Sequence, residues 1–195
     1  MLYSFAIALV KFVMFFVFRI KKTGIENVPK EGGVILAINH KSDLDPVMIG
    51  ITSPRKLNFM AKAELFKNKL FGGLIKRLGA FPVHRNSGDV GALKTSFKIL
   101  NAGGAMLIFP EGGRVKNGEK RGAKPGVAMI AQKTNVPVIP VYIGGEYKWM
   151  HKVTVTYGKP ISFEEYQGQK LSVDDIQLLA DNILNEIYCL GQGCF

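Results

Sequence analysis

The feature that most constrains the fold is an alternation of short apolar runs with segments of helical composition, which begins near Val34. The first run, Val34–Asn39, follows a pair of glycines and lacks the polar alternation of a half-exposed strand. Runs of this kind are typical of strands that are buried on both faces, as in a parallel sheet. The order of strands and helices therefore predicts a single α/β domain, in which helices flank a mostly parallel central sheet.

The other elements follow from the same pattern. Asp45 precedes Pro46, and the pair favours a helix that begins there with Asp45 as its N-cap. Two prolines within 136–143 favour an edge position for that strand. The expected strands are 34–39, 57–60, 80–83, 106–109, 136–143 and 152–157, and the expected helices are 45–52, 64–78, 87–101, 125–134 and 172–190. The helix at 64–78 is expected to be broken by Gly72-Gly73.

The N-terminal segment is almost entirely apolar over residues 1–20. A membrane-spanning helix needs about 20 apolar residues, and a lysine near its centre, such as Lys11, costs about 2.5–3.5 kcal/mol. Basic residues gather at 19–22, where they can meet anionic headgroups. We therefore predict a membrane-embedded or interfacial helix at 1–22, followed by a globular domain at 23–195. A buried core helix and a single membrane span are the alternatives.

Charge narrows the choice of partners. The chain of 195 residues has 26 Lys and Arg against 15 Asp and Glu, a net charge of +11, and the excess lies within residues 1–130. A basic surface attracts phosphate groups of nucleic acid, of anionic lipid or of a small substrate. Nucleic acid is not expected, because most phenylalanines lie in apolar runs and not beside basic side chains. Only two cysteines occur, both near the C-terminus, which indicates a reducing compartment.

One candidate for catalysis is a histidine at the end of the first strand. His40 is followed five residues later by Asp45, at the start of the expected helix. On a strand–turn–helix corner the carboxylate can accept a hydrogen bond from Nδ1 and leave Nε2 free as a general base. A helix cap beside an ordinary polar residue is the alternative. No GxSxG pattern is present and Ser42 fits a turn, so the hydroxyl that His40 deprotonates should belong to a substrate.

A second candidate site follows the strand at 106–109. Glu111-Gly112-Gly113-Arg114 is followed by further basic residues up to Lys124. Glycines let backbone amides approach an anion, and arginine offers a forked donor for phosphate. Arg85 follows the strand at 80–83, so a phosphate near His40 could be bound by Arg85 and Arg114. A solvated flexible loop is the alternative for this basic segment.

Four blocks of the sequence, in this order, resemble those of the glycerolipid acyltransferases, and most closely those of 1-acylglycerol-3-phosphate acyltransferases. The blocks are Asn39-His40-x4-Asp45, Phe81-x3-Arg85, Phe109-Pro110-Glu111-Gly112-Gly113-Arg114 and Val136-Pro137-Val138-Ile139-Pro140-Val141. The resemblance implies transfer of a fatty acyl group from acyl-CoA or acyl carrier protein to the free hydroxyl of a lysophospholipid acceptor, giving phosphatidic acid. It also implies no cofactor and no metal, because a thioester is already activated.

Carried over by position, the resemblance implies that His40 is the general base and that Asp45 orients it. The residues implied in binding the acceptor or its phosphate are Arg85, Glu111, Gly112, Gly113 and Arg114, to which Lys120 and Lys124 are added on charge and position. Gly113 stands where the family usually has Thr or Ser, and His84 where a polar residue such as Asp is common. Both departures leave open which acceptor is used.

The expected location is the cytoplasmic face of the cell membrane, because lysophospholipid and product both prefer a bilayer and anionic lipid attracts the basic N-terminal part of the chain. Other acceptors, such as glycerol 3-phosphate or another lysolipid, are alternatives within the family. A metal-dependent phosphoester hydrolase is the alternative enzyme class, with His40, Asp43, Asp45 and His84 as its ligands. Tyr142, Tyr147 and Trp149 fit either an interfacial aromatic belt or a core.

Overall fold

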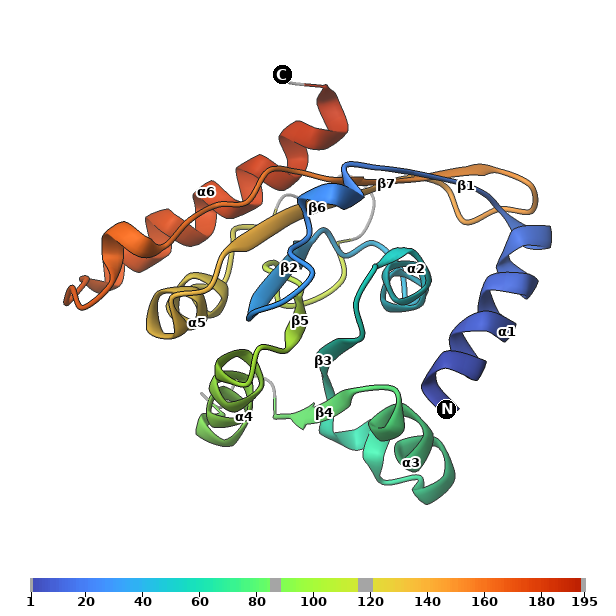
Figure 1. The fold of residues 1–195 in the computed structure, drawn as a ribbon, viewed down its shortest axis with the longest axis horizontal. Helices are drawn as coiled ribbons and strands as arrows, with labels where there is room; N and C mark the ends of the chain where they lie inside the picture. Colours follow the sequence, from blue (N-terminus) through green and yellow to red (C-terminus); the bar gives the residue numbers. More distant parts are fainter. Residues whose placement is uncertain (1, 85–88, 116–120, 194–195) are drawn as a thin grey trace.

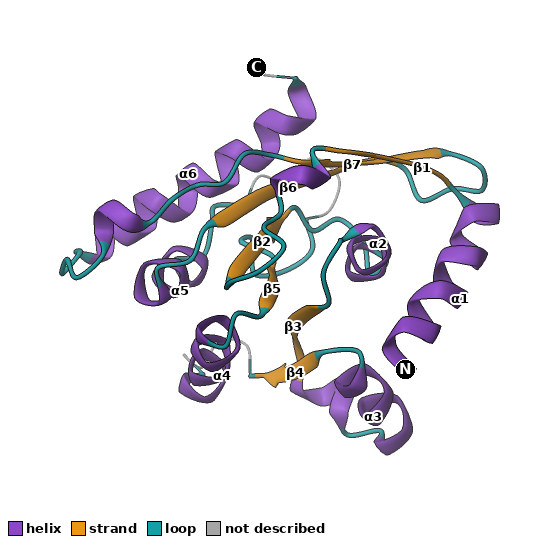
Figure 2. Cartoon of the chain, viewed as in Figure 1, coloured by secondary structure: helices purple, strands orange, loops and turns teal. Residues whose placement is uncertain are grey.

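The fold is described from a computed structural model, which covers residues 2–84, 89–115 and 121–193. Within these residues seven strands form one sheet, in the order β1-β7-β6-β2-β5-β3-β4 (Figures 1 and 2). Neighbouring strands are parallel, except that β6 and β7 are antiparallel. The predicted α/β class with a mostly parallel sheet is therefore confirmed.

Most elements lie where the sequence pattern places them. The strands are β1 (Arg19–Thr23), β2 (Val34–Ile38), β3 (Leu57–Lys62), β4 (Ala80–Val83), β5 (Ala105–Ile108), β6 (Val138–Gly145) and β7 (Lys152–Tyr157). The α-helices are α1 (Leu2–Val17), α2 (Asp45–Thr52), α3 (Lys69–Arg77), α4 (Val90–Asn101), α5 (Gly126–Thr134) and α6 (Val173–Gln192). Short 3₁₀ turns are η1 (Ile25–Asn27), η2 (Ala63–Phe66) and η3 (Glu164–Tyr166).

The helices form two layers, one on each face of the sheet (Figure 1). The chain moves outward from β2 to β4 through α2 and α3, and it returns to β5 and β6 through α4 and α5. Because such crossovers are right-handed, the outward and returning helices cover opposite faces. The strand β2 is fully buried between the layers: Leu36 and Ile38 face the core beneath α1 and α2, whereas Ile35 and Ala37 face the core beneath α5 and α6.

The N-terminal segment differs from its prediction in length. The helix ends at Val17, and Arg19–Thr23 form β1, which pairs in parallel with β7. The partly buried Ile20 packs against the core, so part of the segment predicted as helix at 1–22 belongs to the sheet. In the part of the chain that the structure describes, no helix is both long and apolar enough to cross a bilayer.

Two further predictions need correction. The helix expected at 64–78 is broken, but not at Gly72-Gly73, which both lie within α3. The break separates η2 from α3, because Asn68 accepts a hydrogen bond from the Phe71 N–H and begins α3 as its N-cap. The strand β6 is interior, not an edge strand. It tolerates Pro140 because this residue lies opposite Gly158, just beyond the end of β7: the carbonyl oxygen of Pro140 accepts the Gly158 N–H at 2.8 Å, and the N–H that proline lacks is missing only at the end of the ladder.

Candidate active site

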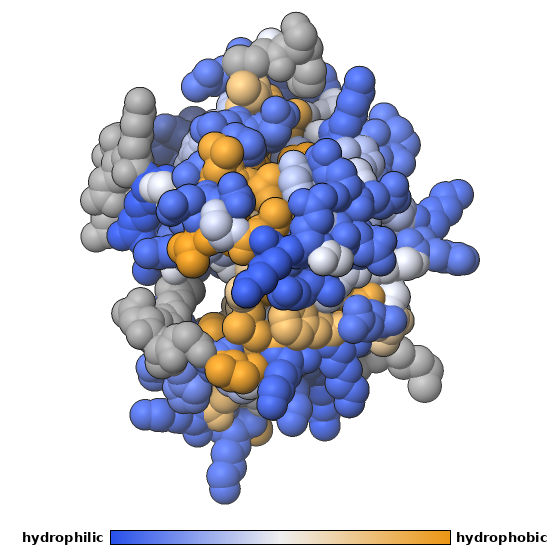
Figure 3. Space-filling model, turned by 90° about the vertical axis from the view of Figure 1, so that its left-hand side faces the viewer, coloured by the Kyte–Doolittle hydropathy of each residue, from blue (hydrophilic) through white to orange (hydrophobic). Residues whose placement is uncertain are grey.

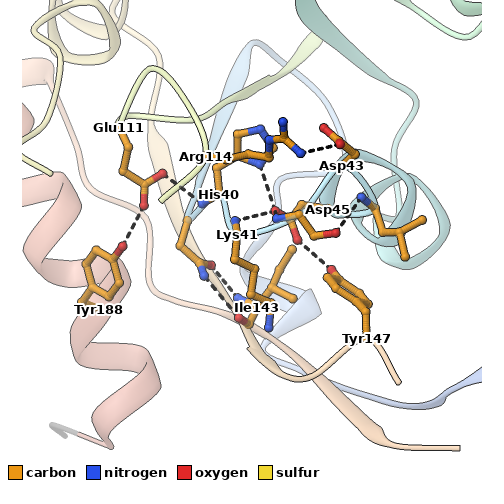
Figure 4. Close-up of polar contacts among 12 residues, drawn as sticks. His40, Lys41, Asp43, Asp45, Glu111, Arg114, Ile143, Tyr147 and Tyr188 are labelled. Carbon is orange, nitrogen blue, oxygen red and sulfur yellow. Dashed lines mark hydrogen bonds and ion pairs between the residues drawn. The ribbon is translucent and has the colours of Figure 1, made fainter. Parts of the chain in front are cut away.

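The structure brings His40 and Asp45 together at the corner between β2 and α2. Nδ1 of His40 lies 2.9 Å from Oδ2 of Asp45 (Figure 4). Asp45 does not cap α2 as predicted, because Leu44 holds the N-cap position. The Asp45 carboxylate turns back instead and accepts hydrogen bonds from the backbone N–H groups of Lys41 and Ser42, both at 2.7 Å. The tight turn therefore fixes the carboxylate beside the imidazole.

The surroundings of His40 define which ring nitrogen is available. A carboxylate can only accept, so the Nδ1 that faces Asp45 carries the proton and the lone pair lies on Nε2. Among the described residues, no hydrogen bond engages Nε2. The imidazole stacks on Phe109, with ring centroids 4.0 Å apart, and His40 is 8% exposed. The ring is thus held by packing and by one hydrogen bond, with its basic nitrogen open.

Sequence reasoning missed a third residue at this corner, Tyr147. Its hydroxyl donates to Oδ1 of Asp45 at 2.8 Å, from the loop between β6 and β7 (Figure 4). Burial raises the pKa of Tyr147 above its ordinary value, and the neighbouring Asp45 raises it further. The side chain therefore remains a phenol that can donate. No local spacing signals this contact, because the two residues are 102 positions apart.

Lys41 also contacts the segment between β6 and β7 that carries Tyr147. Its ammonium group donates to the carbonyl oxygen of Gly145 and lies 5.2 Å from the centre of the Tyr147 ring. Burial lowers the pKa of Lys41, while Asp45 and Glu146 act in the opposite direction. The lysine therefore ties the loop that carries Tyr147 to the turn that carries His40.

Glu111 lies beneath the corner and not on its surface. It is 1% exposed, and its Oε2 accepts the backbone N–H of His40 at 2.9 Å. Its Oε1 accepts the hydroxyl of Tyr188, on α6, at 2.8 Å (Figure 4). Burial raises the pKa of Glu111, although these two hydrogen bonds oppose the rise. Direct contact of Glu111 with an acceptor stays a prediction, since in this geometry the carboxylate joins the β2–α2 corner to α6.

Asn39, just before the histidine, is a second residue that holds the corner. Its buried side-chain amide donates to the carbonyl oxygen of Ile143 at 3.2 Å and accepts from the Ile143 N–H at 2.7 Å. These bonds extend the pairing of β2 with β6 by side-chain contacts after β2 has ended. They therefore fix the point at which the chain leaves the sheet, and with it the position of His40.

The loop after β5 supplies the cationic groups. Arg114, half exposed, forms an ion pair with Asp43 at 2.5 Å. Gly112 has a φ of 69°, and a Cβ there would lie 2.9 Å from Cγ of Lys124, so the exposed Lys124 side chain runs directly over this glycine. Gly113 is buried. Two cations thus lie on the loop that follows Glu111.

Two predicted site residues, Arg85 and Lys120, lie outside the described residues. Arg85 follows β4, which is three strands from β2, or roughly 14 Å across the sheet. The backbone N–H of His84, at the end of the same strand, donates to Asp89.

The ligand set of the hydrolase alternative is not assembled in the described residues. Asp43 pairs with Arg114, and His84 follows a strand three positions away from that of His40. In the ranges that the structure covers, no group of three or more His, Cys, Asp or Glu side chains is placed to hold a metal ion.

Comparison with known proteins agrees with this geometry. A family model described as Acyltransferase matches residues 19–144. The 1-acyl-sn-glycerol-3-phosphate acyltransferase of Bacillus subtilis is 32% identical over 74% of this chain and 72% of the relative. That of Streptococcus pneumoniae is 33% identical over 81% of this chain and 60% of the relative.

A solved structure shows the same fold. The crystal structure of the 1-acyl-sn-glycerophosphate (LPA) acyltransferase PlsC from Thermotoga maritima superposes with a TM-score of 0.77 over 97% of this chain and 78% of that chain, at 24% identity. The matched family span contains the His40–Asp45 corner and the Glu111–Arg114 loop. On these grounds, the chain belongs to the acyltransferase family.

Proposed function

We propose that this protein transfers a fatty acyl group from a thioester, acyl-CoA or acyl carrier protein, to the free hydroxyl of 1-acylglycerol 3-phosphate, giving phosphatidic acid. The observation that carries the proposal is the 2.9 Å contact between His40 and Asp45, with a cationic loop beside it. The names of the Bacillus subtilis and Streptococcus pneumoniae relatives support the choice of acceptor.

In the proposed mechanism Nε2 of His40 accepts the proton of the acceptor hydroxyl while its oxygen attacks the thioester carbonyl carbon. The resulting tetrahedral oxyanion collapses, the carbon–sulfur bond breaks, and the thiolate leaves and takes the proton from Nε2. Ser42 is not assigned as a nucleophile in this scheme, because its hydroxyl accepts the Leu44 N–H within the turn and, among the described residues, no hydrogen bond joins it to His40. No acyl-enzyme is formed, and the activated thioester needs no metal or cofactor.

The phosphate of the acceptor is assigned to the cations of the loop after β5. Arg114 pairs with an exposed carboxylate, Asp43, which a phosphate can replace with a stronger, forked contact. Lys124 lies on the same loop, and Arg85 and Lys120 are assigned to this task on their sequence positions. Gly112, which has no Cβ, lets the Lys124 side chain lie close to the loop backbone, and Gly112 and Gly113 are assigned to the anion on their sequence positions.

Membrane association is assigned to α1. One side of this helix packs against the core through Ile7, Val10 and Met14. The other side is also apolar but open, with Phe12 65% and Phe15 74% exposed. Such a helix suits the interface of a bilayer at the cytoplasmic face, with one side on the protein and the other in lipid.

The acceptor is tested with the purified full chain in detergent, using acyl-CoA or acyl carrier protein and three acceptors: 1-acylglycerol 3-phosphate, glycerol 3-phosphate and a lysophosphatidylcholine. Phosphatidic acid is the expected product, and Arg114→Ala should raise the KM for the acceptor about tenfold or more with little change in kcat. Lys170→Ala, which removes an exposed cation outside the site, is the matched control. Preference for another acceptor, or phosphoester hydrolysis abolished by chelation, would overturn the proposal.

A further inference from the structure

Large hydrophobic side chains are exposed mainly on one side of the molecule. Fourteen are exposed among the side chains described, of which nine lie on α1, η2 and α3 and two in the loop between β6 and β7. These elements occupy the right-hand side of Figure 1. The opposite side, over α4, α5 and α6, has three, and Figure 3 shows that hydrophilic residues cover most of it around a band of apolar ones. Exposed apolar side chains are therefore concentrated on the side of the molecule formed by α1, η2, α3 and the loop between β6 and β7.

The segment from η2 to α3 contributes four of these side chains. Leu70 is 89% and Leu74 45% exposed, and their spacing of four places them on one side of the helix. Phe71 and Leu65 are exposed beside them. The exposed basic residues of residues 63–77 are Lys67, Lys69, Lys76 and Arg77, against the single acid Glu64. An apolar strip with a basic border is complementary to a bilayer that contains anionic lipid.

The second segment is the loop at 146–151, in which Trp149 is 71% and Met150 44% exposed. Glu146 pairs with Lys148 at 2.7 Å, so this acid is neutralised within the loop. The same loop carries Tyr147, which contacts Asp45. Exposed apolar side chains thus lie within three residues of Tyr147, which touches the candidate active site.

The sheet order places these two segments on either side of that site. The strands β6, β2, β5 and β3 are adjacent and mutually parallel, so their carboxyl ends share one edge. The loop at 146–151 follows β6, and η2 follows β3. His40 follows β2, which lies between them. A flat surface that touched both segments would cover the mouth of the site.

We propose that residues 63–77 and residues 146–151 are two lipid-binding segments in addition to α1, and that an anionic bilayer rests on both with the His40–Asp45 pair between them. The inference rests on the proposed function for its choice of a bilayer as the occupant. Its consequence is that the phosphate of the acceptor can reach Arg114 from the headgroup layer while its acyl chain stays in lipid.

Trp149 is the only tryptophan of the chain, so its fluorescence reports whether the loop at 146–151 contacts lipid. The full chain is titrated with phosphatidylcholine vesicles, with and without phosphatidylglycerol. A blue shift of the emission with the anionic vesicles is expected, together with quenching by lipids brominated on their acyl chains. Sedimentation of the protein with vesicles while the emission stays unchanged would overturn the loop contact.

The α3 contact is tested by replacing exposed leucines, which leaves the core unchanged. Leu70→Ser with Leu74→Ser should weaken vesicle binding about tenfold or more, since each leucine loses burial in lipid. Val173→Ser with Leu178→Ser, on α6, changes two side chains that are 82% and 61% exposed and should leave binding unaltered. Wild-type affinity in the first pair, or an equal loss in the control pair, would overturn the contact.

Two measurements separate this inference from its rivals. Acyl transfer to 1-acylglycerol 3-phosphate in detergent needs no vesicle, so it should be equal in the wild type and the Leu70→Ser, Leu74→Ser variant. Loss of transfer in all proteins, with vesicle binding as expected, contradicts the proposed function and not the lipid contacts. The lipid-free protein should sediment as a monomer, and a dimer that Leu70→Ser dissociates would show that a second copy of the chain covers α3.

Discussion

Two buried carboxylates hold the same histidine in different ways. Asp45 is the first residue of α2 and accepts four hydrogen bonds, from two backbone N–H groups, the imidazole and Tyr147. Glu111 lies on the loop after β5 and accepts two, from the backbone N–H of His40 and the hydroxyl of Tyr188. The first carboxylate contacts the ring of His40, and the second contacts its main chain.

The two carboxylates therefore have different roles. Asp45 orients the imidazole ring of His40, and Glu111 holds the main chain of His40 in place. Asp45 determines which nitrogen of the imidazole carries the proton, so its loss should affect the chemical step. Glu111 connects the corner to α6, and with only two hydrogen bonds its burial still raises its pKa. A carboxylate that is buried with few donors costs stability when it is charged, so its loss should affect folding more than chemistry.

The largest expected effect is a loss of kcat when His40 or its partner Asp45 is replaced. Both His40→Ala and Asp45→Asn should lower kcat by about 10³-fold, because the first removes the base and the second replaces an acceptor for Nδ1–H by an amide. The measurement is kcat in detergent, with vesicle binding as the control for folding. Turnover at the wild-type rate in either variant would show that this pair is not the catalytic base.

A smaller effect should distinguish the two tyrosines. Tyr147→Phe removes a donor from Asp45 and should lower kcat about tenfold with little change in KM. Tyr188→Phe removes a donor from Glu111 and should lower the free energy of unfolding by about 1–3 kcal/mol while kcat changes less. Each variant is measured both for kcat and for unfolding in urea. A loss of stability alone in Tyr147→Phe, together with a loss of kcat alone in Tyr188→Phe, would contradict these roles of Asp45 and Glu111.

The smallest effect is a pH dependence at Glu111. Its pKa is raised in the folded protein, so the folded state favours the protonated form and loses stability as pH rises above the ordinary value of 4.5. Glu111→Gln cannot ionise, and its stability relative to the wild type should therefore improve between pH 4 and pH 7. Unfolding in urea across this range measures the difference. A relative stability that is constant with pH would show that Glu111 has an unshifted pKa.

Local patterns predicted the fold because β2 to α5 alternate in short, regular steps. They also predicted the contact of His40 with Asp45, since one tight turn joins the two residues. The hydrogen bonds that Tyr147 and Tyr188 donate to the two carboxylates were not predicted, because the partners lie 102 and 77 positions apart in the sequence. Proximity of that kind depends on the strand order, which no single segment encodes.

The N-cap prediction for Asp45 failed for a related reason. A carboxylate at the start of a helix has several backbone donors within reach, and here it binds those that precede the helix. The role of Arg114 in binding phosphate stays a prediction, and its ion pair with Asp43 was not foreseen, because Asp43 was considered only as a metal ligand.

The position of β1 has a consequence for synthesis of the chain. Residues 19–23 find their sheet partner only in residues 152–156, after most of the polypeptide has left the ribosome. The first strand to emerge is therefore among the last to be incorporated. Throughout this interval α1 is followed by a strand without its sheet partner, so the N-terminal segment takes its place at the edge of the sheet only after residues 152–156 have been made.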